Sequence, residues 1–138
     1  TDRVLVEQRV YGRELTNAVL GDRYLPAVET FPSVENFDYE AKYQAGGAKE
    51  VCPAELTEEQ ARAVGEMALR VHKALGLAVY SRTDMILDAE GNLWCLEANS
   101  LPGMTPTSFV PKEAAAVGIS YDDLCEEIVQ QSLKIKRR

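Results

Sequence analysis

The chain is poor in the side chains that carry most metal and nucleophile chemistry. It has 138 residues, a single histidine, His72, and three cysteines, Cys52, Cys95 and Cys125. One histidine nearly excludes a catalytic triad or a zinc site built on imidazoles. The cysteines are widely spaced and form no CxxC pair, which is typical of reduced packing thiols. His72 falls in a helical pattern, and we expect it on the helix surface.

An excess of positive charge and a long apolar run are also lacking. The 15 Lys and Arg residues against 22 Asp and Glu give a net charge of −7. This argues against nucleic acid or an anionic membrane as the main partner. No apolar stretch approaches the roughly 20 residues of a membrane span, and no signal-peptide pattern is visible. With 46% hydrophobic residues, the sequence predicts a cytoplasmic domain with a substantial core.

The residue patterns predict an α+β domain. Residues 3–10 alternate apolar and polar positions, which indicates a half-buried strand, and residues 11–30 predict two more strands around Gly21-Asp22. Residues 31–53 lack periodicity and predict a long loop, a kind of segment that is usually functional or disordered. The remaining elements expected are a helix at 56–77, strands at 79–87 and 93–98, and helices at 111–118 and 120–138.

Capping and core positions can be named from the same patterns. Thr57 and Gln60 form a capping box, and Ser120 caps the last helix. The expected core consists of Val64, Val71, Leu75, Leu87, Leu96, Leu124 and Ile128.

Two expected strands bring polar side chains together. Side chains alternate between the faces of a strand, so Arg82 and Asp84 share a face, as do Cys95 and Glu97, with Asn99 continuing it. The turn at 88–92 would lay the strands side by side. Two carboxylates and an amide oxygen make a hard oxygen site that suits Mg²⁺ with substrate phosphates as further ligands. The alternative is a pair of solvated acids with Arg82 as their ion-pair partner.

Other notable residues also have plain structural explanations. Pro102-Gly103 alone indicates only a turn, and the hydroxyls of residues 105–108 could simply cap the following helix. Lys42 would be an exposed loop lysine. Glu7 and Glu14 would lie on the polar faces of edge strands.

Several segments taken together resemble a known family. They are LVEQRVYGRELT, FDYEAKY, VCPAEL, SRTDMILDAEGNLWCLEANSLPGMTPTSFVP and AAAVGIS. In this order they resemble the C-terminal part of D-alanine–D-alanine ligases of the ATP-grasp superfamily. The resemblance implies a C-terminal ATP-grasp lobe, with a mainly antiparallel sheet and flanking helices, in which residues 31–53 form a lid. It also implies that N-terminal and central lobes lie outside residues 1–138, which alone are expected to be inactive.

The resemblance assigns roles to particular residues. Asp84, Glu97 and Asn99 would hold two Mg²⁺ ions, or Mn²⁺, with Glu97 shared between them. Arg82 and Gly103 would stabilise the oxyanion of the tetrahedral intermediate. The nucleotide-binding set would be Glu7, Gln8, Val10, Glu14, Lys42, Ile86 and Leu96. Tyr43 would help close the lid, while Ser108 would bind the carboxylate of the second amino acid beside Phe109.

The implied reaction is ATP-dependent joining of two D-alanines through an acyl phosphate, for peptidoglycan precursor synthesis. Ser81 and Phe109 depart from the residues usual in the family, glycine and leucine. The resemblance would place both near the acyl site. The departures leave open a ligase that uses D-lactate or D-serine as second substrate. A separate alternative is a non-catalytic nucleotide-binding domain. The parent protein is expected to be a homodimer.

Overall fold

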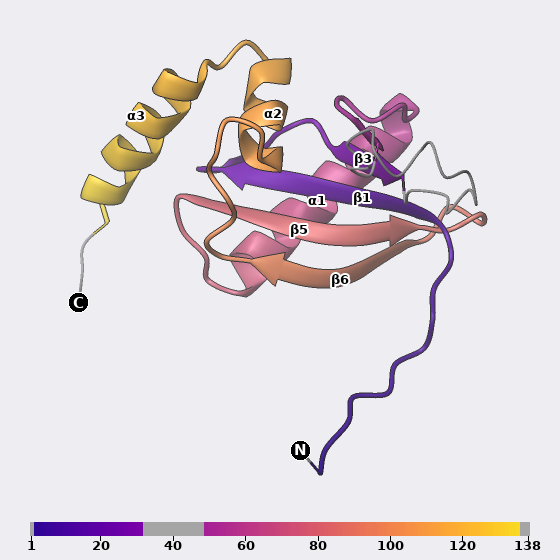
Figure 1. Ribbon diagram of the computed structural model, residues 1–138. Helices are drawn as coiled ribbons and strands as arrows, with labels where there is room; N and C mark the ends of the chain where they lie inside the picture. The colour runs from indigo at the N-terminus through magenta and orange to yellow at the C-terminus, as the bar shows by residue number, and fades with distance from the viewer. Residues whose placement is uncertain (1, 32–48, 136–138) are drawn as a thin grey trace, which may run out of the picture.

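The computed structural model describes residues 2–31 and 49–135, which form one sheet with three helices (Figure 1). The strands are β1 (Arg13–Leu20), β2 (Arg23–Tyr24), β3 (Val28–Phe31), β4 (Lys49–Val51), β5 (Tyr80–Leu87) and β6 (Leu93–Asn99). The helices are α1 (Glu58–Ala74), α2 (Phe109–Ala116) and α3 (Tyr121–Leu133). The sheet order is β4-β3-β1-β5-β6, β2 pairs with β1, and every pairing is antiparallel. The expected α+β class is confirmed.

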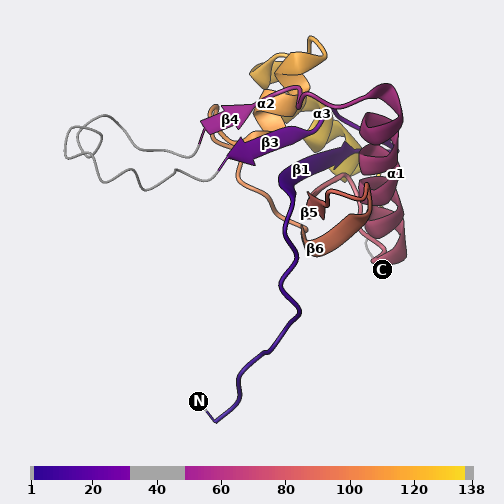
Figure 2. The ribbon, with the colours of Figure 1, turned by 90° about the vertical axis from the view of Figure 1, so that its right-hand side faces the viewer.

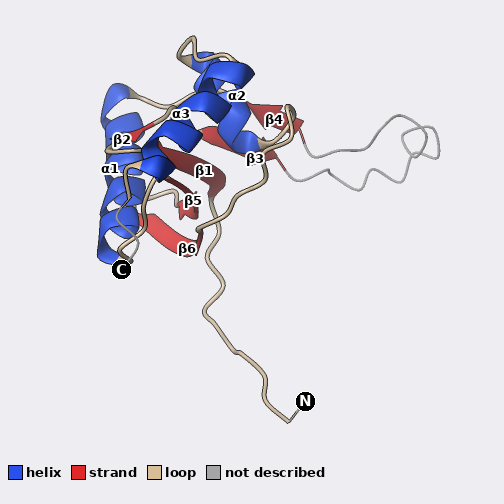
Figure 3. Cartoon of the chain, turned by 90° about the vertical axis from the view of Figure 1, so that its left-hand side faces the viewer, coloured by secondary structure: helices blue, strands red, loops and turns tan. Residues whose placement is uncertain are grey.

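Alternation along β1 sends apolar side chains to both faces of the sheet. Leu15 and Val19 join a buried cluster with α1, whereas Ala18 and Leu20 join a second buried cluster with α2 and α3. Figures 2 and 3 show α1 running along one side of the strands. On the face of β1 that contacts α2, the side chains nearer the start of the strand than Ala18 are polar. The fold therefore presents a polar region on the same face that α2 contacts.

The hairpin that carries much of this region is fixed by its turn. Asp88 accepts hydrogen bonds from the backbone N–H groups of Glu90 and Asn92 and from the Trp94 indole at 2.8 Å. The Trp94 hydrogen bond is the main cause that lowers the pKa of the exposed Asp88 carboxyl. Hydrogen bonds of this kind hold the register of β5 against β6.

The expected strand at residues 3–10 is wrong. These residues are extended and, apart from the partly exposed Val10, exposed, and they pair with no strand among the described residues. The segment leaves the sheet at the start of β1 (Figure 1). An alternating pattern makes a strand only where a neighbouring strand supplies hydrogen bonds and a core covers its apolar face.

Helix α1 buries a narrower stripe than its pattern suggests. Val64, Gly65, Ala68 and His72 are buried, whereas Leu75 is 61% exposed. The expectation that His72 lies on the surface is wrong. Its ring Nδ1 lies 2.7 Å from the Ser81 Oγ, so β5 supplies the polar partner that lets an imidazole enter the core.

Some of the other residues expected in the core are buried and others are not. Leu87 and Leu124 are buried, as expected. Val71 and Ile128 are partly buried. Leu96 is 57% exposed on β6, an edge strand, so its placement in the core is wrong. Part of the predicted loop at 31–53 is strand β4, and residues 32–48 lie outside the described part.

The capping box at the start of α1 is confirmed and gives a first prediction. The Thr57 side chain accepts from the Gln60 N–H at 3.2 Å, and the Gln60 side chain accepts from the Thr57 N–H at 3.1 Å. Thr57→Ala should lower the free energy of unfolding by about 1 kcal/mol, because it leaves a helix N–H without its partner. Urea unfolding measures this, with Thr57→Ser as the control that keeps the hydroxyl. Equal losses in both variants would contradict a capping role.

Candidate functional site

A β-bulge between β5 and β6 sets the geometry of the polar region. Asp84 lies opposite Glu97 and Arg82 opposite Asn99, whereas Met85 lies opposite Cys95. The register shifts between Asp84 and Met85 because Leu96 is an extra residue on β6.

The bulge changes which β6 side chains share a face. Residues directly opposite each other point to the same face of a sheet. Cys95 therefore shares the face of Met85, and Glu97 shares the face of Asp84. The expectation that Cys95 and Glu97 lie on one face is wrong, because the extra residue reverses the alternation. The expected convergence of Asp84, Glu97 and Asn99 on neighbouring strands is what the register shows.

Asp84 is the centre of a hydrogen-bonded group. Its two oxygens accept from Arg82 Nε at 3.0 Å and Nη2 at 2.9 Å, and Thr16 Oγ1 on β1 donates to Oδ1 at 2.9 Å. The guanidinium carbon of Arg82 lies 5.5 Å from the centre of the Phe109 ring. These contacts fix the orientation of the planar guanidinium, whose donors match carboxylate or phosphate oxygens. Thr16 was missed from the sequence, although alternation along β1 places it on this face.

The turn before α2 brings a hydroxyl and a glycine to this region. Ser108 Oγ accepts from the Thr105 N–H at 3.1 Å and lies 2.7 Å from Thr105 Oγ1. Ser108 is the N-cap residue of α2 but makes no side-chain cap bond, so its hydroxyl serves the turn instead. A Cβ on Gly103 would lie 3.1 Å from Ser108 Oγ, which favours a residue without a side chain there. The Tyr121 hydroxyl on α3 donates to the Met104 carbonyl at 2.6 Å and anchors the turn.

A cavity of ≈ 190 Å³ connects the turn with the strand group. Its lining residues are Glu50, Arg82, Gly103, Thr107, Ser108 and Phe109. Glu50 comes from β4 and forms an ion pair with Lys112 of α2. Neither Glu50 nor Lys112 was predicted at the site. Glu50 falls in a stretch without periodicity, so the sequence pattern does not place its side chain.

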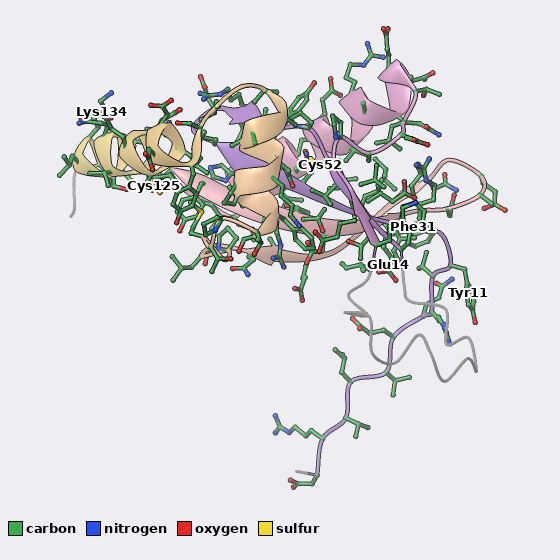
Figure 4. The ribbon with its side chains drawn as sticks, turned by 45° about the horizontal axis from the view of Figure 1, so that its top comes forward. Tyr11, Glu14, Phe31, Cys52, Cys125 and Lys134 are labelled. Carbon is green, nitrogen blue, oxygen red and sulfur yellow. The ribbon has the colours of Figure 1, made fainter. Side chains whose placement is uncertain are left out.

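The other residues that the sequence predicted for the site lie elsewhere on the sheet, on the N-terminal segment or outside the described residues. Glu7 and Gln8 lie on the exposed N-terminal segment with the partly exposed Val10, and the structure does not bring them to the cavity. Glu14 and Ile86 are directly opposite partners on the face of Asp84. Figure 4 shows Glu14 and Phe31 at the end of the sheet where the N-terminal segment leaves. Lys42 and Tyr43 lie outside the described residues.

The donor set of the strand pair fits a hard divalent cation. Asp84, Glu97 and Asn99 offer only oxygen, and the Asn99 Oδ1 is oriented by the Leu101 N–H at 2.9 Å. Residues 2–31 and 49–135 contain no group of three or more His, Cys, Asp or Glu side chains that could hold a metal alone. Two carboxylates and an amide therefore suit Mg²⁺, which takes water and phosphate oxygens as its other ligands.

A buried acid on α2 was also missed from the sequence. Glu113 is fully buried, and its Oε2 accepts from the Ala18 N–H at 2.6 Å, while its Oε1 has no hydrogen-bond partner in the structure. Burial raises the pKa of this carboxyl well above its usual range, and the Ala18 hydrogen bond and the Arg82 charge only partly offset the effect.

Glu113 predicts a pH dependence of stability with a definite sign. A carboxyl whose pKa is raised on folding takes up a proton, so its contribution to stability falls as the pH rises through the unfolded value near 4.5 toward the folded one. Glu113→Gln keeps the acceptor for Ala18 and removes the charge. The variant should be more stable than the unmodified protein at pH 7, and the difference should shrink below about pH 4.5. Thermal melts across this range measure it, and a difference that does not change with pH would contradict the assignment.

Comparison with known proteins identifies the family of the chain. The family described as "D-ala D-ala ligase C-terminus" matches residues 1–130. A D-alanine–D-alanine ligase of Oleidesulfovibrio alaskensis is 50% identical over 130 residues, which are 94% of this chain and 42% of that protein.

Solved structures show the same likeness. The Bacillus anthracis D-alanine–D-alanine ligase complexed with ATP has a TM-score of 0.79 at 37% identity over 93% of this chain and 42% of its own. The VanG D-Ala:D-Ser ligase of Enterococcus faecalis has a TM-score of 0.77 at 29% identity over 90% of this chain and 37% of its own. The chain thus spans less than half the length of its relatives. It belongs to the family of D-alanine–D-alanine ligase C-terminal domains, within the ATP-grasp fold.

Proposed function

We propose that this chain is the C-terminal lobe of an ATP-dependent ligase that joins two D-alanines during peptidoglycan precursor synthesis. The observation that carries the proposal is the face of the sheet that four polar residues share. Asp84 lies opposite Glu97 and Arg82 lies opposite Asn99, beside the cavity that Ser108 lines. The three free cysteines suit a reducing compartment such as the cytoplasm. No helix in the described residues is long and apolar enough to cross a membrane.

Each group on the face would have a defined part in the reaction. Asp84, Glu97 and Asn99 would hold one or two Mg²⁺ ions, which supply charge neutralisation for the ATP phosphates. Ile86 would pack against the adenine and Glu14 would accept from the ribose hydroxyls. Leu96, Glu7, Gln8 and Val10 stay predicted nucleotide contacts, as does Lys42.

The acyl-transfer half of the reaction would use the cavity. The carboxylate of the first D-alanine would attack the γ-phosphate of ATP and displace ADP, which gives an acyl phosphate. The ammonium of the second D-alanine would lose a proton, and the resulting amine would attack the acyl carbon and displace phosphate. The Arg82 guanidinium and the Gly103 N–H would stabilise the oxyanion that forms at the attacked carbonyl. Ser108 would donate to the carboxylate of the second D-alanine, with Phe109 as the apolar wall. Tyr43 stays a predicted lid residue.

A ligase that uses D-serine is the second candidate, because VanG shares the fold over most of the chain. The higher identity to the Oleidesulfovibrio alaskensis enzyme favours D-alanine. A non-catalytic role is disfavoured because Arg82, Asp84, Glu97 and Asn99 occupy one face together.

Phosphate release by the full-length parent protein tests the proposal. The assay supplies ATP and Mg²⁺ with D-alanine alone, and then D-alanine with either D-lactate or D-serine. We expect release with D-alanine alone and D-alanyl-D-alanine as the main product of each mixture. Release that requires D-serine would support the second candidate, and no D-alanine-dependent release would reject the ligase assignment.

A further inference from the structure

The cavity under Ser108 contains one acid whose role the family assignment leaves open. Among the described residues that line it, Glu50 is the carboxylate and Arg82 is the cation, while Thr107 and Ser108 contribute hydroxyls. A lining with one group of each charge matches a zwitterion rather than a simple anion.

The sheet places Glu50 on the face of the proposed site. Glu50 lies directly opposite Thr30, which lies directly opposite Glu14, and Glu14 is the partner of Ile86. Directly opposed residues share a face, so Glu50 points to the same side as Arg82 and Asp84, which share the face of Ile86 by alternation along β5. Strand β4 thereby carries its carboxylate toward the turn before α2.

Lys112 holds this carboxylate in place. The Lys112 ammonium pairs with Glu50 Oε2, and the two side chains are 35% and 29% exposed. A carboxylate has lone pairs for more than one donor, so Glu50 keeps capacity for a second cation. The ion pair reduces the freedom of the Glu50 side chain, which lowers the entropic cost of binding a ligand there.

We propose that Glu50, held by Lys112, binds the ammonium group of the second amino acid and so favours an amine over a hydroxy acid as acceptor. This inference rests on the proposed function and adds a specificity residue to it. The amine must lie near Arg82, because the carbonyl that it attacks carries the oxyanion which Arg82 stabilises. Asp84 already pairs with Arg82, so Glu50 is the carboxylate of the cavity lining that can attract the ammonium. A D-hydroxy acid has no such charge and gains nothing from Glu50.

Glu50→Gln in the full-length parent tests the proposal. The unmodified parent and the variant are each given ATP, D-alanine and an equal concentration of D-lactate, and the dipeptide and the ester product are quantified. The variant should show a KM for the second D-alanine raised about tenfold, which corresponds to about 1.4 kcal/mol. Its ratio of dipeptide to ester should fall by a similar factor, with kcat little changed.

Two further variants separate this role from a general effect of charge or folding. Glu127→Gln removes a carboxylate of similar exposure that pairs with Arg23 and does not line the cavity. This variant should leave the second-substrate KM and the product ratio unchanged. Lys112→Met removes the group that holds Glu50, and it should raise the second-substrate KM less than Glu50→Gln does. If Glu50→Gln fails to fold, as a thermal melt would show, Lys112→Met is compared with the unmodified parent, and an unchanged second-substrate KM in that variant would overturn the role of Glu50.

The outcomes distinguish this inference from the function on which it rests. An unmodified parent that forms no dipeptide would overturn both. Normal dipeptide formation by the parent, with an unchanged second-substrate KM and product ratio in Glu50→Gln, would overturn only the role of Glu50.

Discussion

Replacing Glu97 by Gln in the full-length parent is expected to lower ATP-dependent phosphate release by roughly 10²–10³-fold. Glu97 lies directly opposite Asp84 because of the bulge at Leu96, and the two carboxylates supply the negative charge that a divalent cation needs. Gln keeps the size of the side chain and removes its charge. A steady-state phosphate assay at saturating D-alanine measures the loss.

The matched control for this change lies in the same hairpin. Glu90 is exposed in the turn between β5 and β6, where its backbone N–H bonds Asp88. Glu90→Gln therefore alters the net charge equally without reaching the polar face, and its rate should equal that of the unmodified protein. A Glu97→Gln variant that keeps near-normal turnover would show that Glu97 holds no essential ion.

Leu15→Ala should strongly destabilise the fold, with a loss of about 2–5 kcal/mol in the free energy of unfolding. Leu15 is 2% exposed near the start of β1, where it joins Val64, Ala68 and Met85 in the cluster between the sheet and α1. Truncation removes apolar contacts and leaves a cavity that strands on both sides of β1 prevent from collapsing. Chemical denaturation of the chain measures the free energy of unfolding.

Leu101→Ala serves as the comparison for Leu15. Leu101 is 77% exposed, so its truncation removes few buried apolar contacts. The free energy of unfolding should change by no more than about 0.5 kcal/mol. Similar losses for the two leucines would mean that the cluster beneath α1 does not carry the stability of the fold.

The hairpin shows how far the sequence leads and where it stops. Alternation along β5 correctly puts Arg82 and Asp84 on one face, because β5 is regular and central. The same rule fails on β6, where it assigned Cys95 and Glu97 to one face. A single extra residue reverses the alternation, and no turn or glycine signal in LWCLEAN marks the bulge.

Burial of polar groups was equally hard to foresee. His72 and Glu113 fall in helical patterns as ordinary polar positions, but each enters the core because a strand packed against its helix supplies a partner, Ser81 and the Ala18 N–H respectively. Such partners depend on how helices sit against the sheet, and a single helical pattern does not contain that information. Glu50 and Ser108 line the same cavity for the same reason, because the packing of α2 against the sheet brings their elements together.

The N-terminal segment illustrates the opposite error. Residues 3–10 alternate as a strand should, but a strand also needs a neighbour, and the described residues provide none. Pattern alone therefore identifies a segment capable of pairing rather than one that is paired.

A crystal structure of the full-length parent with Mg²⁺ and a non-hydrolysable ATP analogue tests the central claim most directly. The account predicts Mg²⁺ between the analogue's phosphates and the side-chain oxygens of Asp84, Glu97 and Asn99, at about 2.1 Å from each ligating oxygen. Density for Mg²⁺ and phosphates away from these three residues would contradict it.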